Sequence, residues 1–75
     1  MNKALLEYRM RERGVSISKM CSVLGMSRSA FYRKCNGISE FTLGEIQKIV
    51  DYLELDSPME IFFYPESVLK DTENI

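Results

Sequence analysis

The residues best suited to chemistry in this sequence lie between Ser27 and Gly37, where polar side chains are spaced to share one face of a helix. These side chains are Arg28, Ser29, Tyr32 and Arg33. Arginine presents a planar fork of donors that matches the O6 and N7 acceptors of guanine, and hydroxyl groups can bond bases or phosphates. The chemistry that these four side chains could perform is therefore hydrogen bonding to nucleic acid.

Two short helices must position this face. Ser16 and Ser27 are suitable N-cap residues, and Gly37 suits the end of the second helix. We expect helices over residues 16–24 and 27–36, joined at Gly25 and Met26. Two short helices with a tight, glycine-containing turn form a helix-turn-helix, whose second helix enters the major groove of DNA.

Charge is distributed unevenly along the chain, although the net charge is only −1. Residues 14–37 carry four basic side chains, Lys19, Arg28, Arg33 and Lys34, and no acidic one. Residues 38–75 carry nine acidic side chains against two lysines. A basic first half and an acidic second half fit a protein with one DNA-facing side. The alternative interpretation is that these charges belong to an ordinary solvated surface.

The flanking segments predict three further helices and no strand. The first spans residues 2–13 and stops at Gly14. Thr42 and Glu45 form a capping box, which precedes a helix with an apolar face made by Leu43, Ile46, Val50 and Leu53, with Ile49 beside it. Residues 57–60 suggest a second capping box with Pro58 at the first helical position, opening a short helix that ends near Phe63. Ile38 and Phe41 are expected to anchor the intervening loop.

Composition bounds the remaining possibilities. A chain of 75 residues with 45% hydrophobic residues suits one small all-α domain, here residues 1–64, followed by a polar tail, residues 65–75. No apolar run approaches the roughly 20 residues of a membrane span, and the N-terminal segment lacks the apolar stretch of a signal peptide, so we expect a cytoplasmic protein.

Catalysis and metal binding are not expected. The chain has no histidine, which excludes nucleophilic pairs of a serine or cysteine with a histidine base. Cys21 and Cys35 match no zinc-ligand spacing, and we expect both to be buried thiols. We predict neither an enzyme nor a bound cofactor.

The pattern as a whole resembles the lambda-repressor-like family, the Cro/C1-type or XRE-type helix-turn-helix proteins that include small phage and prophage regulators. The resemblance covers roughly residues 2–63 and is carried by Gly14-Val15-Ser16, Met20-Cys21, Leu24-Gly25-Met26-Ser27, Phe31 and Asn36-Gly37. It implies a compact five-helix domain that binds double-stranded DNA sequence-specifically and regulates transcription as a repressor or Cro-like protein.

The resemblance also implies roles for individual residues. The residues that read bases would be Arg28, Ser29, Tyr32 and Arg33, and those that contact phosphates would be Ser16, Lys19, Asn36 and Ser39. Lys34 replaces an apolar residue of the family, so it either projects outward or adds a phosphate contact. Many members pair an arginine with a glutamate where this chain has Met10 and Cys35, so we predict that these two residues touch.

A single recognition helix reads few base pairs, so we expect a homodimer on a pseudo-palindromic operator. The apolar candidates for the dimer contact are Met59, Phe63 and Tyr64, while Ile61 or Phe62 closes the core. The alternative function is a protein-interaction module on the same fold, such as a phage antirepressor that binds another regulator. The net negative charge and the apolar segment 59–64 favour that alternative. Ile17 favours it too, because the resemblance implies a glutamine that supports DNA contact at this position.

Overall fold

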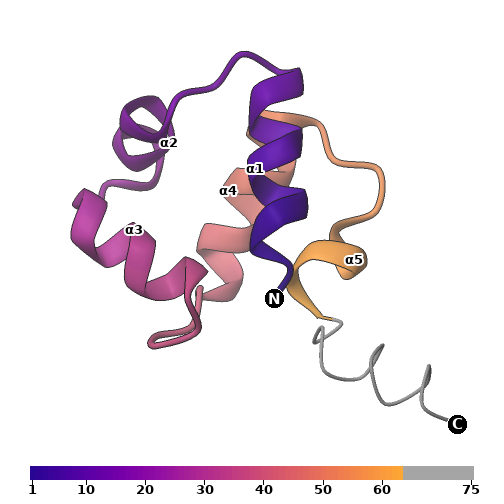
Figure 1. Cartoon of the computed structure of the whole chain (residues 1–75). Helices are drawn as coiled ribbons and strands as arrows, with labels where there is room; N and C mark the ends of the chain where they lie inside the picture. Colours follow the sequence, from indigo (N-terminus) through magenta and orange to yellow (C-terminus); the bar gives the residue numbers. More distant parts are fainter. Residues whose placement is uncertain (64–75) are drawn as a thin grey trace, which may run out of the picture.

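The computed structural model describes residues 1–63 of the chain, and the regular elements of this part are all α-helices (Figure 1). The predicted fold class is therefore confirmed. Tyr64 and the predicted tail, residues 65–75, lie outside the described residues. The helices of the described part are α1 (Lys3–Glu12), α2 (Ile17–Leu24), α3 (Arg28–Cys35), α4 (Leu43–Leu53) and α5 (Pro58–Phe62).

Side-chain oxygens set the starts of the first four helices. The oxygens of Asn2, Ser16, Ser27 and Thr42 each accept a hydrogen bond from the backbone N–H three residues later. These bonds satisfy N–H groups that have no partner within their own helix. Glu45 completes the predicted capping box by accepting from Thr42 N at 2.9 Å.

The buried core draws side chains from all five helices. Phe31 of α3 lies near its centre, 1% exposed, with its ring edge-on to that of Phe41 at 5.9 Å between centroids. Ile61 is 1% exposed, which confirms that α5 closes the core. The buried hydrophobic residues are Leu6, Met10, Met20, Cys21, Leu24, Phe31, Cys35, Ile49, Leu53 and Ile61.

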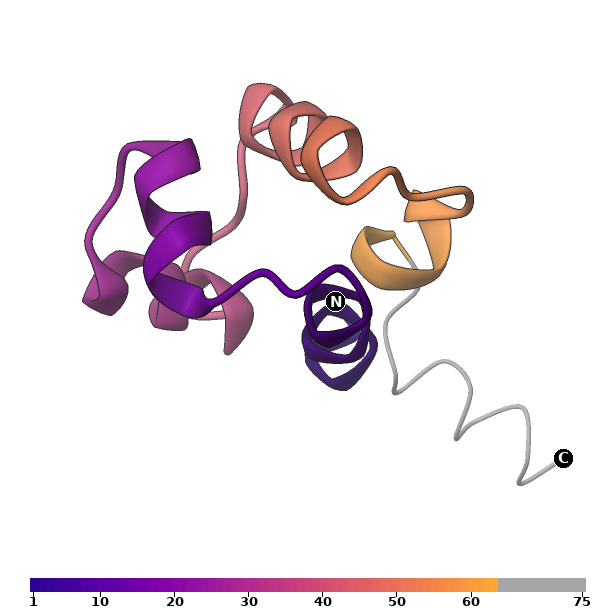
Figure 2. The ribbon, with the colours of Figure 1, turned by 90° about the horizontal axis from the view of Figure 1, so that it is seen from above.

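The helices divide into two packed groups (Figures 1 and 2). The α2 helix packs against both α3 and α4, whereas α1 packs against α5. The two ends of the described chain meet directly, because Asn2 N donates to Ile61 O at 2.6 Å. This arrangement leaves α2 and α3 together on one side of the molecule, away from α5 (Figure 2).

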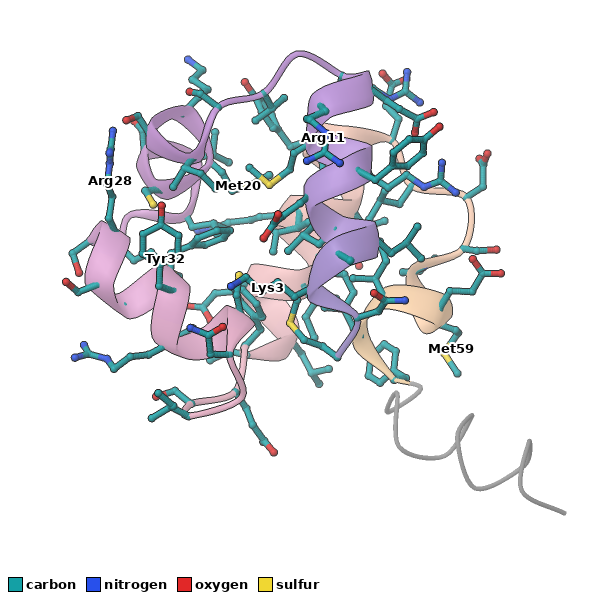
Figure 3. All side chains as sticks on the ribbon, viewed as in Figure 1. Lys3, Arg11, Met20, Arg28, Tyr32 and Met59 are labelled. Atoms are coloured by element: carbon teal, nitrogen blue, oxygen red, sulfur yellow. The ribbon has the colours of Figure 1, made fainter. Side chains whose placement is uncertain are left out.

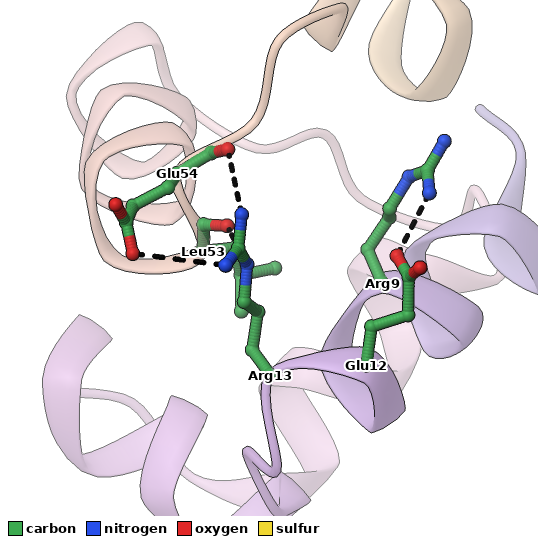
Figure 4. Close-up of polar contacts among 5 residues, drawn as sticks. All are labelled: Arg9, Glu12, Arg13, Leu53 and Glu54. Atoms are coloured by element: carbon green, nitrogen blue, oxygen red, sulfur yellow. Dashed lines mark hydrogen bonds and ion pairs between the residues drawn. The ribbon is translucent and has the colours of Figure 1, made fainter.

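Arg13, just after α1, fastens that helix to the end of α4 (Figure 4). Its Nε donates to the carbonyl oxygen of Leu53 at 2.9 Å, and its Nη2 donates to that of Glu54 at 3.4 Å. Glu54 ends α4 in the left-handed conformation, with φ of 53°. The arginine therefore satisfies carbonyl groups that the end of α4 leaves without helical partners.

Three local predictions are wrong. Ser57 makes no side-chain cap, so the second capping box does not form and Pro58 alone sets the start of α5. Leu43 is 78% exposed because it occupies the first turn of α4, beyond the edge of the core. Ile38 is 72% exposed, and Phe41 alone anchors the loop. In residues 1–63, no helix has both the length and the apolar character needed to cross a bilayer.

Candidate nucleic-acid interface

The α2 and α3 helices meet at a three-residue turn that places α3 at the molecular surface. Gly25 ends α2 with φ of 68°, a conformation that favours glycine, and Met26 N returns to Cys21 O at 3.1 Å. Ser27 then caps α3 through its hydroxyl, which accepts from Ala30 N at 3.1 Å. The predicted helix-turn-helix is present with the predicted capping residues.

The two faces of α3 differ in composition and exposure. Its inner face buries Phe31 and Cys35 in the core. The structure exposes all four side chains that the sequence proposed as base-reading, Arg28, Ser29, Tyr32 and Arg33. Tyr32, which could have been a packing residue, is 42% exposed while its ring edge still contacts Phe31.

Arg28 lies at the start of α3 and extends toward α2 (Figure 3). Its Nη2 donates to Ser18 Oγ, a contact that joins the two helices of the motif. Sequence reasoning missed Ser18, because an exposed serine in a helix carries no signal of its partner. The contact orients the guanidinium without neutralising it, since a hydroxyl carries no charge.

The predicted phosphate-contacting residues flank α3 on both sides. Ser16 and Lys19 are exposed at the start of α2, where the Ser16 hydroxyl already accepts from Lys19 N at 3.1 Å. Asn36 and Ser39 are exposed in the segment after α3. Lys3 of α1 reaches this segment too, since its Nζ donates to Asn36 Oδ1 at 3.0 Å. That contact joins residues 33 positions apart, and no local pattern predicts it.

Lys34 differs from the other basic residues of the motif. Its ammonium forms an ion pair with Glu45 Oε1 at 2.6 Å, and only 17% of its side chain is exposed. It also lies 5.8 Å from the ring centroid of Phe41. Lys34 therefore points toward α4, and its charge is balanced within the domain.

The two cysteines behave as buried thiols, as predicted. Burial raises the pKa of Cys35 to about 11, so its thiol stays protonated and unreactive near neutral pH. Met10 and Cys35 belong to the same core cluster, but their direct contact stays a prediction. No cluster of three potential metal ligands occurs within residues 1–63.

Comparison with known protein families matches residues 6–67 to the Cro/C1-type HTH DNA-binding domain. The chain belongs to this family. The match covers residues 6–12 of α1 and the whole of α2 to α5, and it confirms the resemblance seen in the sequence. No curated protein and no solved structure matches the chain.

Membership in the Cro/C1-type family makes the chain a DNA-binding domain of the kind found in regulators. The surface described above is the part of this Cro/C1-type domain that is suited to that activity. It combines an exposed helix, hydroxyl groups and three cations, Lys19, Arg28 and Arg33, that make no ion pair within residues 1–63. Residues 14–37 contain no carboxylate side chain that would repel a phosphate backbone.

Proposed function

We propose that this Cro/C1-type domain is a sequence-specific transcriptional regulator of the repressor or Cro kind, phage or prophage in type, whose α3 helix reads the major groove. The observation that carries the proposal is the division of α3 into a buried face and an exposed face. The exposed face presents Arg28, Ser29, Tyr32 and Arg33. Arg28 and Arg33 are suited to guanine, and Ser29 and Tyr32 to a base edge, a thymine methyl group or a phosphate.

Phosphate contacts on both sides of α3 would fix its register on the duplex. Ser16 and Lys19 at the start of α2 would contact one strand, and Asn36 and Ser39 after α3 would contact the other. These residues supply affinity that does not depend on sequence. We leave Lys34 out of this interface, because its ammonium is paired with Glu45.

A homodimer would place two such helices on a pseudo-palindromic operator. Met59 and Phe63, at 48% and 46% exposed, are the described apolar candidates for the dimer contact, and Met59 points away from the core (Figure 3). Phe63 also borders a groove of about 560 Å³ shared with Phe41, Leu43 and Ile46. Burying these side chains against a second copy would remove apolar surface from water.

Selection of bound duplexes from a random pool tests the proposal. We expect a recovered site with two inverted halves, each containing guanine at positions that Arg28→Gln or Arg33→Gln no longer selects. Arg9→Gln on α1 is the matched control, since it removes one arginine charge outside the motif and should keep the same site. Recovery of no preferred sequence would contradict sequence-specific reading.

A protein-interaction module is the second candidate function, with another regulator as its partner. It is favoured by the apolar side chains that remain exposed near the groove, Leu43 and Phe63 above all. Binding to random duplex DNA separates the two functions. A DNA reader binds such duplexes weakly and loses affinity as salt rises, whereas a module dedicated to a protein partner shows no such binding.

A further inference from the structure

The basic segment of residues 14–37 has four cations, and one of them, Lys34, differs from the rest in its ion pairing. Within residues 1–63, Lys19, Arg28 and Arg33 make no ion pair, whereas Lys34 is paired with Glu45 at 2.6 Å. Glu45 is separated from Lys34 by the loop that follows α3 and belongs to the first turn of α4. The carboxylate that pairs with Lys34 therefore comes from outside the helix-turn-helix.

The carboxylate of Glu45 is held in place by more than Lys34. The same Oε1 atom accepts from Thr42 N at 2.9 Å, and Glu45 N donates to Thr42 Oγ1 at 3.1 Å. Only 20% of the Glu45 side chain is exposed. A carboxylate fixed by the capping box of its own helix cannot follow Lys34 if that side chain swings outward.

The ammonium of Lys34 is held on a second side by an aromatic ring. Its Nζ lies 5.8 Å from the centroid of Phe41, a distance at which the ring face attracts a cation. To reach a phosphate, Lys34 would have to leave both the carboxylate and the ring. Arg33, the residue before Lys34, is exposed and makes no ion pair within residues 1–63, so it faces no such loss.

We propose that Glu45 withholds Lys34 from DNA and thereby sets the number of phosphates that the domain neutralises. Glu45 is a positioning residue, since it acts through Lys34 and touches no DNA itself. The inference rests on the proposed DNA-binding function of α3. Its consequence is a limit on sequence-independent affinity, which leaves a larger share of binding to the residues that read bases.

Binding of the full chain to a random-sequence duplex over a range of salt concentrations tests this directly. Each phosphate neutralised adds about 0.9 to the slope of log Kobs against log salt. We expect Glu45→Gln to steepen the slope by about that amount, so that affinity falls about 3.5-fold more between 50 and 200 mM salt than it does for the wild type. Glutamine still accepts from Thr42 N, so the capping box is preserved.

Three matched variants separate release of Lys34 from a general change in charge. Glu40→Gln removes an equal charge from an exposed loop residue that makes no ion pair within residues 1–63, and should leave the slope unchanged. Lys34→Gln should also leave it unchanged, because Lys34 contacts no phosphate in the wild type. The double variant with Lys34→Gln and Glu45→Gln should return the slope to the wild-type value.

Specific outcomes overturn the inference. A slope for Glu45→Gln equal to that of Glu40→Gln would show that Lys34 is not withheld, and so would a loss of slope in Lys34→Gln alone. If the salt slope of the double variant is as steep as that of Glu45→Gln, Glu45 affects DNA binding by a route other than Lys34. If the wild type binds no duplex at any salt concentration, the proposed function fails, and the inference fails with it.

Discussion

Arg9 and Arg13, near the C-terminal end of α1, have surroundings opposite to those of Arg28 and Arg33 in the helix-turn-helix. Arg9 pairs with Glu12 at 2.8 Å, and Arg13 is joined to the end of α4 by hydrogen bonds and a 3.9 Å ion pair with Glu54 (Figure 4). Arg28 and Arg33 make no ion pair within residues 1–63. Arginine therefore makes contacts within the domain in one region and is exposed to a partner in the other.

The difference follows from where the sequence places its acidic residues. Residues 14–37 contain none, so a cation of the motif can pair only with a carboxylate from another part of the chain. Arg13, which joins α1 to α4, should therefore matter for folding, and Arg28 and Arg33 for binding. Variants that change only one of these two properties test this difference.

The largest effect is expected where α3 serves folding. Phe31→Ala removes a ring that is 1% exposed, and should lower the free energy of unfolding by about 3–5 kcal/mol. Tyr32→Ala, one residue along and on the outer face, is the matched control and should cost much less stability. Urea unfolding followed by circular dichroism measures both, and equal losses would contradict the division of α3 into two faces.

The next effect concerns binding alone. Arg28→Gln and Arg33→Gln should each reduce affinity for the selected operator by about 1–3 kcal/mol, because each loses a bidentate donor to guanine. Thermal unfolding should be almost unchanged, since both side chains are exposed. Fluorescence anisotropy with a labelled duplex checks the prediction, which is wrong if affinity is retained in both variants.

Arg13→Gln should show the reverse behaviour. It loses the donors to the carbonyl groups of Leu53 and Glu54, and we expect a loss of about 1 kcal/mol in stability with DNA affinity unchanged. Arg9→Gln, which breaks an exposed pair within α1, should have no measurable effect on stability. A drop in DNA affinity for Arg13→Gln without loss of stability would remove the distinction between the two regions.

The smallest effect is a dependence of stability on pH. Burial alone would raise the pKa of Glu45, but hydrogen bonds from Lys34 and Thr42 lower it below its ordinary value. The stabilisation is therefore present above the unfolded pKa of about 4.3 and is lost as pH falls through the lower folded value. We expect less than about 1 kcal/mol, and Lys34→Gln should flatten this part of the stability profile.

The features that could be predicted from the sequence are those set by residues close to one another along the chain. The caps at Ser16, Ser27 and Thr42, the turn at Gly25 and the buried side of α3 all follow from local rules. In these three caps the hydroxyl and the N–H that it accepts from lie three residues apart in the same segment, so the bond needs no partner from elsewhere in the fold. The family and the exposed face of α3 could be predicted for the same reason.

Contacts between distant elements could not be predicted in this way. Helical periodicity placed Leu43 on the apolar face of α4, but it does not show that the core ends before the first turn. The pairing of Lys34 with Glu45 and the contact of Arg28 with Ser18 depend on how the helices cross. Only the folded arrangement shows which cations are paired with a carboxylate within residues 1–63.

The bond between Asn2 N and Ile61 O has a consequence for synthesis of the protein. The first helix leaves the ribosome early, yet its buried side chains Leu6 and Met10 share a core with Ile61, which emerges much later. Translation must therefore pass Ile61 before α1 gains its final packing. Until then the nascent chain exposes the apolar side chains of α1 that Ile61 helps to bury.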